Sequence, residues 1–371
     1  MGTATERARL LRKSFELLAA HGDRAVLQFY AELFIRAPGL RDMFGVAMSA
    51  QRDRFFQALA AIVTRVEQPE TLLPFLRQLA RDHRKYGVRA EHFEPTGQAL
   101  LATLGWFLGS EWTTPVQRAW VEAYQLVSEA MIEELNRAEP QSPPWWTARV
   151  VRHERRPGRI AVVRCLPDRP LPYLPGQYLT VETEYWPRVW RRFSIANAPA
   201  PDHVLELHVR AVGAGWVSNA MVGRVHPGDQ LRLGPAMGQM VLDPRSARPV
   251  LCVAGGTGLA PLKAIAQQLA RQRPARRLSL YFGAEREDEL YDLDELRRMD
   301  VRYPWLRVVP TVSEQFSTRW RRGAVPDVVA EDGEWTDHDI YVCGPRPMVQ
   351  ATVNMLLSRG CSSERLWYDQ D

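Results

Sequence analysis

The spacing of apolar residues changes twice along this chain of 371 residues, and that change restricts its possible folds more than any other feature. Up to about residue 140, apolar residues recur every three or four positions, as in Leu72, Phe75, Leu76 and Leu79, which is typical of amphipathic helices. From there to about residue 246 the period falls to two, in short segments that Gly and Pro separate. Beyond that point, continuous apolar strands alternate with helical segments.

These regions predict an all-α domain, then an antiparallel β-barrel, then an α/β domain with a doubly wound parallel sheet. The expected boundaries are 1–138, a Pro-rich linker at 139–146, 147–246 and 247–371. Barrel strands are expected at 147–152, 159–164, 178–183 and 205–210. Strands of the parallel sheet are expected at 249–254, 277–282, 306–311 and 339–343.

The composition is that of an ordinary globular protein, with 46% hydrophobic residues, 25% charged residues and a net charge of +5. The basic residues form no dense run, so nucleic acid is not an expected partner. The four cysteines lie far apart, without zinc spacing, which favours a reducing cytoplasm. No apolar leader and no stretch of 18 uncharged apolar residues is present, so neither export nor stable membrane insertion is expected.

His83 continues the apolar stripe of residues 72–79 by one more turn, so its imidazole is expected to face the helical core. Such a side chain is either a core histidine satisfied by hydrogen bonds or a ligand for iron. Its position alone favours the first interpretation. His21, beside a glycine at a helix end, and His92, in a turn, lack the setting of His83.

Two motifs in the barrel region have the chemistry of a flavin site. Arg191-Arg192-Phe193-Ser194 offers a charged fork for a diphosphate, a ring for a flat heterocycle and a small hydroxyl. The segment 215–219 offers backbone N–H groups at the start of a helix, which suit a phosphate. Each motif alone also fits a basic strand end or an ordinary helix cap.

The strongest single signal is a Gly-rich turn between a buried strand and a helix. Its residues are Gly255, Gly256, Thr257 and Gly258, with Pro261 in the first turn of the helix. Glycines allow the backbone to approach a pyrophosphate, and the helix dipole favours its charge. The turn therefore predicts a dinucleotide site, because it has the required strand and helix on either side.

Cys343 ends a later strand, at the edge of the sheet where ligands bind. It is followed by Gly344, Pro345 and Met348. Cys165 and Cys252 are expected to be buried core residues.

The segments 28–34, 37–44 and 79–93 resemble the globin domain of bacterial flavohaemoglobins, over about residues 5–137. This resemblance implies a haem b pocket with His83 as the iron ligand. It also implies two distal catalytic residues, Tyr30 and Gln51, and two apolar haem contacts, Phe44 and Phe55. A Tyr hydroxyl and a Gln amide can each donate a hydrogen bond to a dioxygen ligand.

The motifs of the second half, in their order, resemble the ferredoxin-reductase-like FAD and NAD(P)H domains that flavohaemoglobins carry. The resemblance implies FAD contacts at Tyr178, Arg191, Arg192, Phe193, Ser194, Val217 and Ser218. It implies nicotinamide-dinucleotide contacts at Gly255, Gly256, Thr257, Gly258, Pro261, Cys343, Gly344, Pro345 and Met348, and an acidic contact at Asp369. The acidic run at 285–289 opposes a 2′-phosphate, which favours NADH over NADPH.

The resemblance implies that electrons pass from NADH to FAD and then to haem iron, and that nitric oxide and dioxygen react there to give nitrate. Phe93 and Leu135 occupy the positions of the family's proximal Tyr and Glu, and Asp82 replaces a basic residue. Three alternatives therefore stay open: reduction of peroxide or an organic compound, an oxygen-binding or sensing role, and a flavin reductase without haem. Whether the chain is a monomer or a homodimer is left open as well.

The end of the chain departs from the family too. Asp371 stands where flavohaemoglobins place a Phe over the flavin. Trp367 or Tyr368 is the candidate replacement for that ring.

Overall fold

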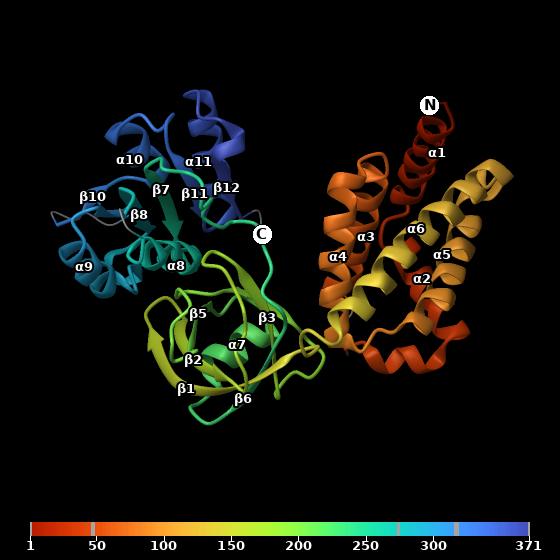
Figure 1. Cartoon of the computed structure of the whole chain (residues 1–371), viewed down its shortest axis with the longest axis horizontal. Helices are drawn as coiled ribbons and strands as arrows, with labels where there is room; N and C mark the ends of the chain where they lie inside the picture. The colour runs from red at the N-terminus through yellow and green to blue at the C-terminus, as the bar shows by residue number, and fades with distance from the viewer. Residues whose placement is uncertain (1, 46–48, 273–274, 315–318, 370–371) are drawn as a thin grey trace. The chain divides into compact units, whose positions relative to one another are not determined.

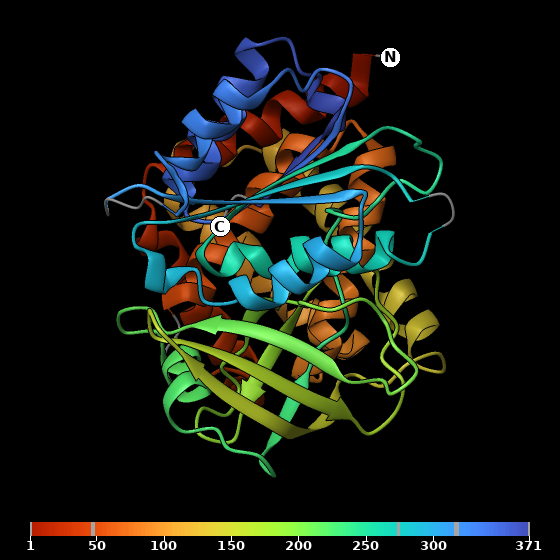
Figure 2. The ribbon, with the colours of Figure 1, turned by 90° about the vertical axis from the view of Figure 1, so that its left-hand side faces the viewer.

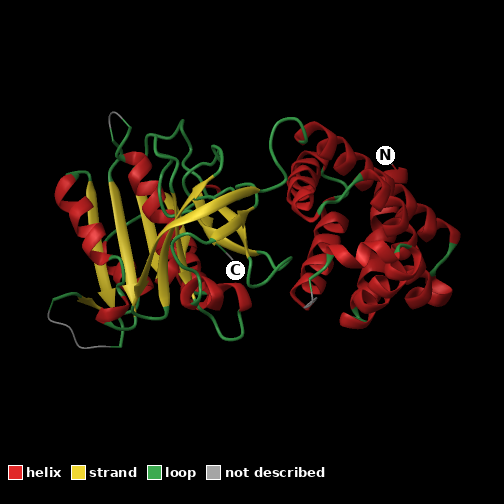
Figure 3. Ribbon diagram, turned by 90° about the horizontal axis from the view of Figure 1, so that it is seen from below, coloured by secondary structure: helices red, strands yellow, loops and turns green. Residues whose placement is uncertain are grey.

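The computed structural model describes residues 2–45, 49–272, 275–314 and 319–369, with the backbone alone at residues 2–4 and 49–54. The chain divides into two compact units. The first comprises residues 1–145 and 187–189, and the second comprises residues 146–186 and 190–371. Figure 3 shows that one unit is helical and that the strands belong to the other.

The first unit is built from six helices in its described part (Figure 1). They are α1 (Gly2–Ala19), α2 (Asp23–Arg36), α3 (Ser49–Arg65), α4 (Pro69–His83), α5 (Phe93–Leu108) and α6 (Thr114–Ala138). Short 3-10 turns at 38–43, 84–86, 90–92 and 109–111 connect them. Pro69 and Pro115 lie in the first turns of α4 and α6, where a missing N–H has no helical partner to lose.

The apolar core of this helical unit consists of two clusters that share no residue. The larger cluster joins α1, α2, α3, α5 and the start of α6, and it contains Tyr30 with Phe44 and Phe55 packed against it. The smaller cluster joins α4 to the end of α6 and contains Leu76 and Leu135. The helix that ends at His83 therefore packs in a different cluster from the aromatic rings.

The second unit begins with a six-stranded antiparallel sheet in the order β4-β3-β6-β1-β2-β5. Its strands are β1 (Trp146–Arg156), β2 (Ile160–Pro167), β3 (Tyr178–Thr183), β4 (Arg191–Ser194), β5 (Leu205–Arg210) and β6 (Gln230–Leu233). A bridge between Ile195, just after β4, and Leu207 in β5 closes the sheet into a barrel. Helix α7 (Trp216–Gly223) follows β5.

The rest of this unit is a six-stranded parallel sheet in the order β10-β9-β8-β7-β11-β12. Its strands are β7 (Val250–Gly255), β8 (Leu278–Ala284), β9 (Leu306–Val312), β10 (Arg321–Arg322), β11 (Asp339–Cys343) and β12 (Leu366–Tyr368). Its helices are α8 (Leu259–Leu269), α9 (Leu293–Arg302), α10 (Val325–Asp332) and α11 (Arg346–Ser358), with 3-10 turns at 256–258, 287–289 and 363–365.

Successive side chains of each strand point to opposite faces of the parallel sheet, so this domain has one apolar core on each face. Val250, Cys252 and Ala254 of β7 face α8 and α9. Leu251 and Val253 face α10 and α11. Figure 2 shows α8 and α9 between the parallel sheet and the barrel, so these two helices connect the halves of the second unit. The predicted fold class is confirmed: an all-α domain, an antiparallel barrel and a doubly wound parallel sheet.

Helix α6 ends at Ala138 and β1 begins at Trp146. Among the described residues, no helix combines the length and the apolar character that crossing a bilayer requires.

Candidate functional site

His83 is the last residue of α4, and its side chain is half-buried. Its Nδ1 lies 2.7 Å from the carbonyl oxygen of Leu79. A carbonyl only accepts hydrogen bonds, so Nδ1 carries the proton and Nε2 keeps its lone pair. Burial lowers the pKa of His83, which keeps the ring neutral. A neutral imidazole held in this tautomer is the donor that an iron ion requires.

Three of the predicted distal residues form one aromatic cluster. Tyr30 on α2 is buried, and its ring centroid lies 5.4 Å from that of Phe44 and 6.1 Å from that of Phe55. Phe55 also stacks on Phe29 at 4.2 Å. The structure thus brings together Tyr30, Phe44 and Phe55 from α2, the end of a 3-10 turn and α3. Gln51 lies on α3, and its side chain is outside the described residues.

The helical unit fits a haem by the chemistry of its donor and by the division of its core. His83 ends α4, which contributes Leu72 and Leu76 to the smaller apolar cluster, and the rings around Tyr30 belong to the larger one. A haem needs a nitrogen donor for its iron and separate sets of apolar side chains against its two faces. The described residues supply both.

Two apolar residues, Phe93 and Leu135, stand at the positions of the family's proximal Tyr and Glu. Both pack in the smaller apolar cluster. Glu134, one residue earlier on α6, is buried but pairs with Arg81 at 3.2 Å and Arg137 at 2.5 Å. The hydrogen bond that the structure gives to His83 Nδ1 is therefore the one to a backbone carbonyl.

A buried lysine two residues after His83 was not identified from the sequence. Lys85 is 6% exposed and pairs with Asp82, the residue before His83. Its ammonium also lies 5.1 Å from the ring centroid of Tyr86. Nothing in the local pattern distinguishes Lys85 from a solvated lysine, because its burial depends on how the turn at 84–86 folds back.

The predicted flavin motif lies on two paired strands. Tyr178 of β3 pairs in register with Ser194 of β4. Phe193 and Ser194 are half-buried, so the ring and the hydroxyl are each partly accessible. The guanidinium of Arg192 lies 5.2 Å from the Tyr178 ring centroid, and Arg191 donates to the Trp190 carbonyl at 2.9 Å. This surface fits a flat heterocycle with a charged tail.

The predicted phosphate loop opens helix α7. Gly215 has no room for a Cβ, which would lie 2.6 Å from Ser218 Oγ. Ser218 Oγ donates to the Gly215 carbonyl at 3.1 Å and is 3.4 Å from the Val212 nitrogen. The Ser218 hydroxyl therefore holds the loop in shape, and Val217 beside it is fully buried.

The Gly-rich turn and Cys343 meet at the point where the parallel sheet changes direction. Strand β7 has β8 on one side and β11 on the other, and Ala254 pairs with Cys343. Gly256 has a φ of +52°, and a Cβ on Gly258 would overlap the Cys343 carbonyl. A glycine is therefore required at both positions, and the resulting crevice at the strand ends is where α/β sheets bind dinucleotides.

The remaining predicted contacts gather around the same crevice. A Cβ on Gly255 would lie 2.6 Å from Met348 Sδ and 2.9 Å from the Pro345 ring, so these residues close the turn. Cys343 Sγ lies 3.9 Å from Asp369 Oδ2. Gly344 follows Cys343, Thr257 lies in the 3-10 turn, and Pro261 lies in the first turn of α8. The structure thus places this set at one edge of the sheet.

The candidate lid residues differ in their surroundings. Trp367 stacks on Tyr341 with ring centroids 4.9 Å apart, so its ring is packed against the sheet. Tyr368 is 38% exposed. Of the two, Tyr368 is the ring that remains available to cover a flat ligand, and Asp371 lies outside the described residues.

Arg210 is a second residue that sequence reasoning missed. It ends β5 in the barrel, yet its Nη1 lies 3.4 Å from where a Gly256 Cβ would be. Its Nη2 is 3.9 Å from Glu289 Oε1. A cation from the barrel therefore borders the predicted pyrophosphate turn, a contact that only the tertiary structure shows.

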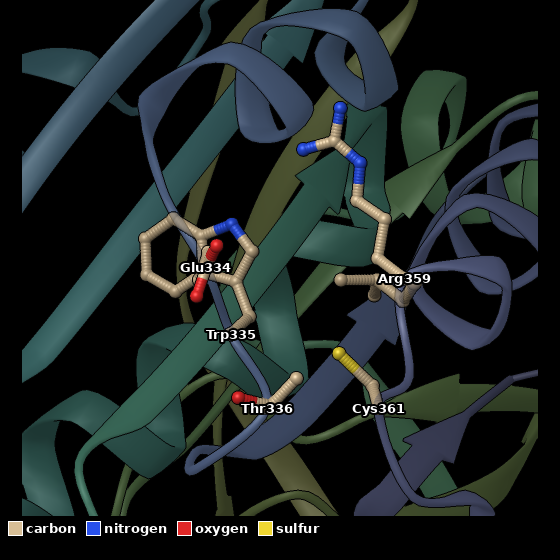
Figure 4. A pocket seen from close by; sticks show the side chains of 6 residues that line it. Glu334, Trp335, Thr336, Arg359 and Cys361 are labelled. Carbon is tan, nitrogen blue, oxygen red and sulfur yellow. The ribbon is translucent and has the colours of Figure 1, made fainter.

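A cavity of about 290 Å³ lies at the end of the parallel sheet opposite the Gly-rich turn (Figure 4). Its walls include Trp335 and Thr336, which precede β11, and Arg359 and Cys361, which precede β12. The amino-terminal ends of the strands border it, and none of the predicted site residues does. It therefore plays no part in the site described above.

Comparison with known families divides the chain in the same order as the fold. The globin family model matches residues 27–131. The oxidoreductase FAD-binding domain matches residues 159–241, and the oxidoreductase NAD-binding domain matches residues 252–354.

Individual relatives cover the whole chain or its second half. The flavohemoprotein of Bordetella parapertussis is 29% identical over 386 residues, which cover 96% of this chain and 95% of that protein. XylA, the electron transfer component of xylene/toluene monooxygenase of Pseudomonas putida, is 33% identical over 228 residues, covering 60% of this chain and 65% of that protein. The crystal structure of flavohemoglobin from Malassezia yamatoensis shares the fold, with a TM-score of 0.81, 17% identity and coverage of 100% of this chain and 99% of that one.

Proposed function

Because this chain belongs to the flavohaemoglobin family and is an oxidoreductase using haem, FAD and NAD(P)H, we propose that it is a nitric oxide dioxygenase. In this role NAD(P)H is oxidised and nitric oxide is converted to nitrate. The balanced reaction takes two NO, two O₂ and one NADH to two nitrate, one NAD⁺ and one proton. The haem iron, when bound, supplies the site of dioxygen chemistry, and FAD converts hydride into single electrons.

The proposal rests on the presence, in the same unit, of a neutral His83 and of a tyrosine inside an aromatic cluster. His83 keeps Nε2 for iron because Nδ1 donates to Leu79. Tyr30 packs against Phe44 and Phe55, so a hydroxyl donor lies among aromatic rings. A donor in such surroundings stabilises developing negative charge on a ligand more than it would in water.

The proximal side favours dioxygen over peroxide as the physiological oxidant. A carboxylate or phenol hydrogen-bonded to the proximal histidine would raise its basicity and promote cleavage of an O–O bond. Here Nδ1 donates to the Leu79 carbonyl, while Glu134 is held by two arginines. Burial lowers the pKa of His83, Asp82 and the hydrogen bond to Leu79 raise it by smaller amounts, and Lys85 lowers it by the smallest amount.

Tyr30→Phe tests the distal half of the proposal. Removing the hydroxyl leaves the ring contacts with Phe44 and Phe55, so folding is expected to be preserved. A lost hydrogen bond to a charged group is worth about 1.5–3 kcal/mol, which corresponds to roughly 10- to 150-fold. NADH-dependent NO consumption is expected to fall, and the dioxygen off-rate to rise, by a factor in that range.

Tyr124→Phe is the matched control, because its hydroxyl donates to the Phe93 carbonyl within the same unit. NO consumption and the dioxygen off-rate should stay within about twofold of wild type in this control. Equal rates in Tyr30→Phe and wild type would remove the role assigned to Tyr30.

NADH is the proposed electron donor. The segment after β8 carries Glu285, Glu287 and Asp288, and the guanidinium of Arg286 pairs with Asp288 at 3.1 Å. A 2′-phosphate placed there meets carboxylates, with Arg286 already paired. The kcat/KM for NADH is expected to exceed that for NADPH by about tenfold or more. Steady-state kinetics of flavin reduction with each donor measure this ratio of kcat/KM, and a preference for NADPH would refute the assignment.

A further inference from the structure

Strand β5 of the barrel carries charged side chains on a face that is buried. Leu205, Leu207 and Val209 alternate with Glu206 and His208. Glu206 is 5% exposed and His208 is 3% exposed, although both are polar. Their environment is supplied by α8 and by the residues before α9, which belong to the parallel-sheet domain.

A lysine from α8 neutralises this face. Lys263 Nζ lies 2.9 Å from Glu206 Oε1 and 2.6 Å from Asp292 Oδ2. Arg164 of β2 donates to the other Glu206 oxygen at 2.7 Å. Burial raises the pKa of Glu206, but His208 and Lys263 outweigh it, so that the pKa lies well below its usual range. Burial lowers the pKa of Lys263, and the two carboxylates reverse this and raise it.

These contacts fix the tautomer of His208. Its Nε2 lies 3.0 Å from Glu206 Oε1, and a carboxylate only accepts, so Nε2 carries a proton. Lys263 and Arg164 oppose the charge of the two carboxylates. With the ring proton on Nε2, Nδ1 accepts a hydrogen bond, and the Tyr291 hydroxyl 2.6 Å away donates it. Tyr291, His208 and Glu206 thus form a directed hydroxyl–imidazole–carboxylate chain.

The same carboxylates and imidazole have a geometry that a metal ion could use. One ligand atom from each of Glu206, His208 and Asp292 lies within 4.8 Å of the others. Lys263 Nζ already bridges the two carboxylates. The buried ammonium is therefore the resident cation, and the cluster is not a metal site.

Tyr291 connects this network to the predicted nicotinamide crevice. Its ring packs edge-on against Phe282 of β8 at 5.9 Å, and it shares an apolar core with Cys343. Phe282 pairs with Ala254, which pairs on its other side with Cys343. Tyr291 therefore lies at the carboxyl edge of the sheet, while its hydroxyl is held by a strand of the flavin barrel.

We propose that Tyr291, His208 and Glu206, with Lys263 as their counter-ion, form a positioning unit that aligns the nicotinamide end of the parallel sheet with the flavin barrel for hydride transfer. The unit acts through the crevice and touches neither reacting atom. It rests on the NADH-to-FAD half of the proposed function. Two almost fully buried contacts join the two domains, His208–Tyr291 and Glu206–Lys263, and the His208–Glu206 contact within β5 connects them.

Tyr291→Phe tests the proposal in the whole chain loaded with haem and FAD. Anaerobic stopped-flow reduction by NADH is expected to show a limiting rate about tenfold lower at pH 8. NAD⁺ affinity measured by calorimetry is expected to stay within about threefold, since the Gly-rich turn is unchanged.

Tyr281→Phe is the matched control, because Tyr281 is buried in β8 of the same sheet and its hydroxyl bonds to Asp332 on the other face. It should keep the wild-type limiting rate. If Tyr291→Phe retains that rate as well, the proposal is overturned. If Tyr291→Phe fails to retain FAD, His208→Asn is tested instead, by its limiting rate of flavin reduction and its NAD⁺ affinity. A wild-type chain that NADH does not reduce would instead contradict the proposed function.

Discussion

A chain with His83→Ala is expected to lose haem ligation and its normal Soret band while it keeps FAD. The imidazole is the nitrogen donor identified on α4, and its Nδ1–Leu79 hydrogen bond serves to orient it. Changes in groups that only orient a metal ligand cost about 10–100-fold in affinity. Loss of the ligand itself is expected to weaken haem retention by more than about a hundredfold. Haem and FAD content after desalting, with the absorption spectrum, provide the measurement.

His92→Ala is the control, because His92 lies in a 3-10 turn and accepts a hydrogen bond from the Arg89 backbone. It should retain haem. His83→Gly with added imidazole should recover a Soret band, which separates loss of the ligand from loss of the fold. An unaltered spectrum in His83→Ala would reject the ligand assignment.

Gly258→Ala is expected to abolish flavin reduction by NADH, with at least about a hundredfold loss of rate. The added Cβ would overlap the backbone carbonyl of Cys343, and neither backbone segment is a flexible end that moves at little cost. Strand β11 must shift away from β7, and the crevice between the Gly-rich turn and Cys343 changes shape. FAD content should be retained, since the flavin residues lie on β3 and β4.

Gly333→Ala serves as the matched control in the same domain. Its Cβ would lie 3.7 Å from the Trp335 ring, an ordinary contact. Dithionite should reduce the flavin fully in both variants, which confines the Gly258→Ala defect to NADH. Normal NADH reduction in Gly258→Ala would contradict the placement of the dinucleotide at this turn.

The sequence was sufficient to predict the fold class and the local structure around the Gly-rich turn. The Gly-rich turn is flanked by a buried strand and a helix in the sequence itself, and the structure shows both. The position of Cys343 beside that turn followed from the rule that ligands bind at the carboxyl ends of strands. The stripe on α4 likewise predicted that His83 faces inward.

The missed residues have long-range environments that no local pattern encodes. Glu206 and His208 alternate with apolar residues, as on a strand with one solvated face. Only the packing of α8 and Lys263 against β5 turns that face into a buried one. Lys85 and Arg210 were missed for the same reason, because each depends on a segment distant in sequence or on the shape of a turn.

The register of α6 was decisive for the proximal side. Two adjacent acids, Glu133 and Glu134, precede Leu135 on α6. Leu135 packs in the smaller apolar cluster with α4, and the buried Glu134 pairs with Arg81 of α4 and with Arg137. The family's carboxylate is therefore not merely displaced by one residue. It is absent from His83, and the chemistry of the iron is expected to follow the backbone hydrogen bond.

The most direct test of the account is NADH-dependent NO consumption in air by the whole chain loaded with haem and FAD. We expect fast turnover, nitrate as the product and two NO consumed for each NADH. We also expect both variants to be slower, Tyr30→Phe in its reaction with NO and Gly258→Ala in flavin reduction by NADH. Full reduction of flavin and haem by NADH, with NO consumption no faster than in the haem-free chain, would contradict it.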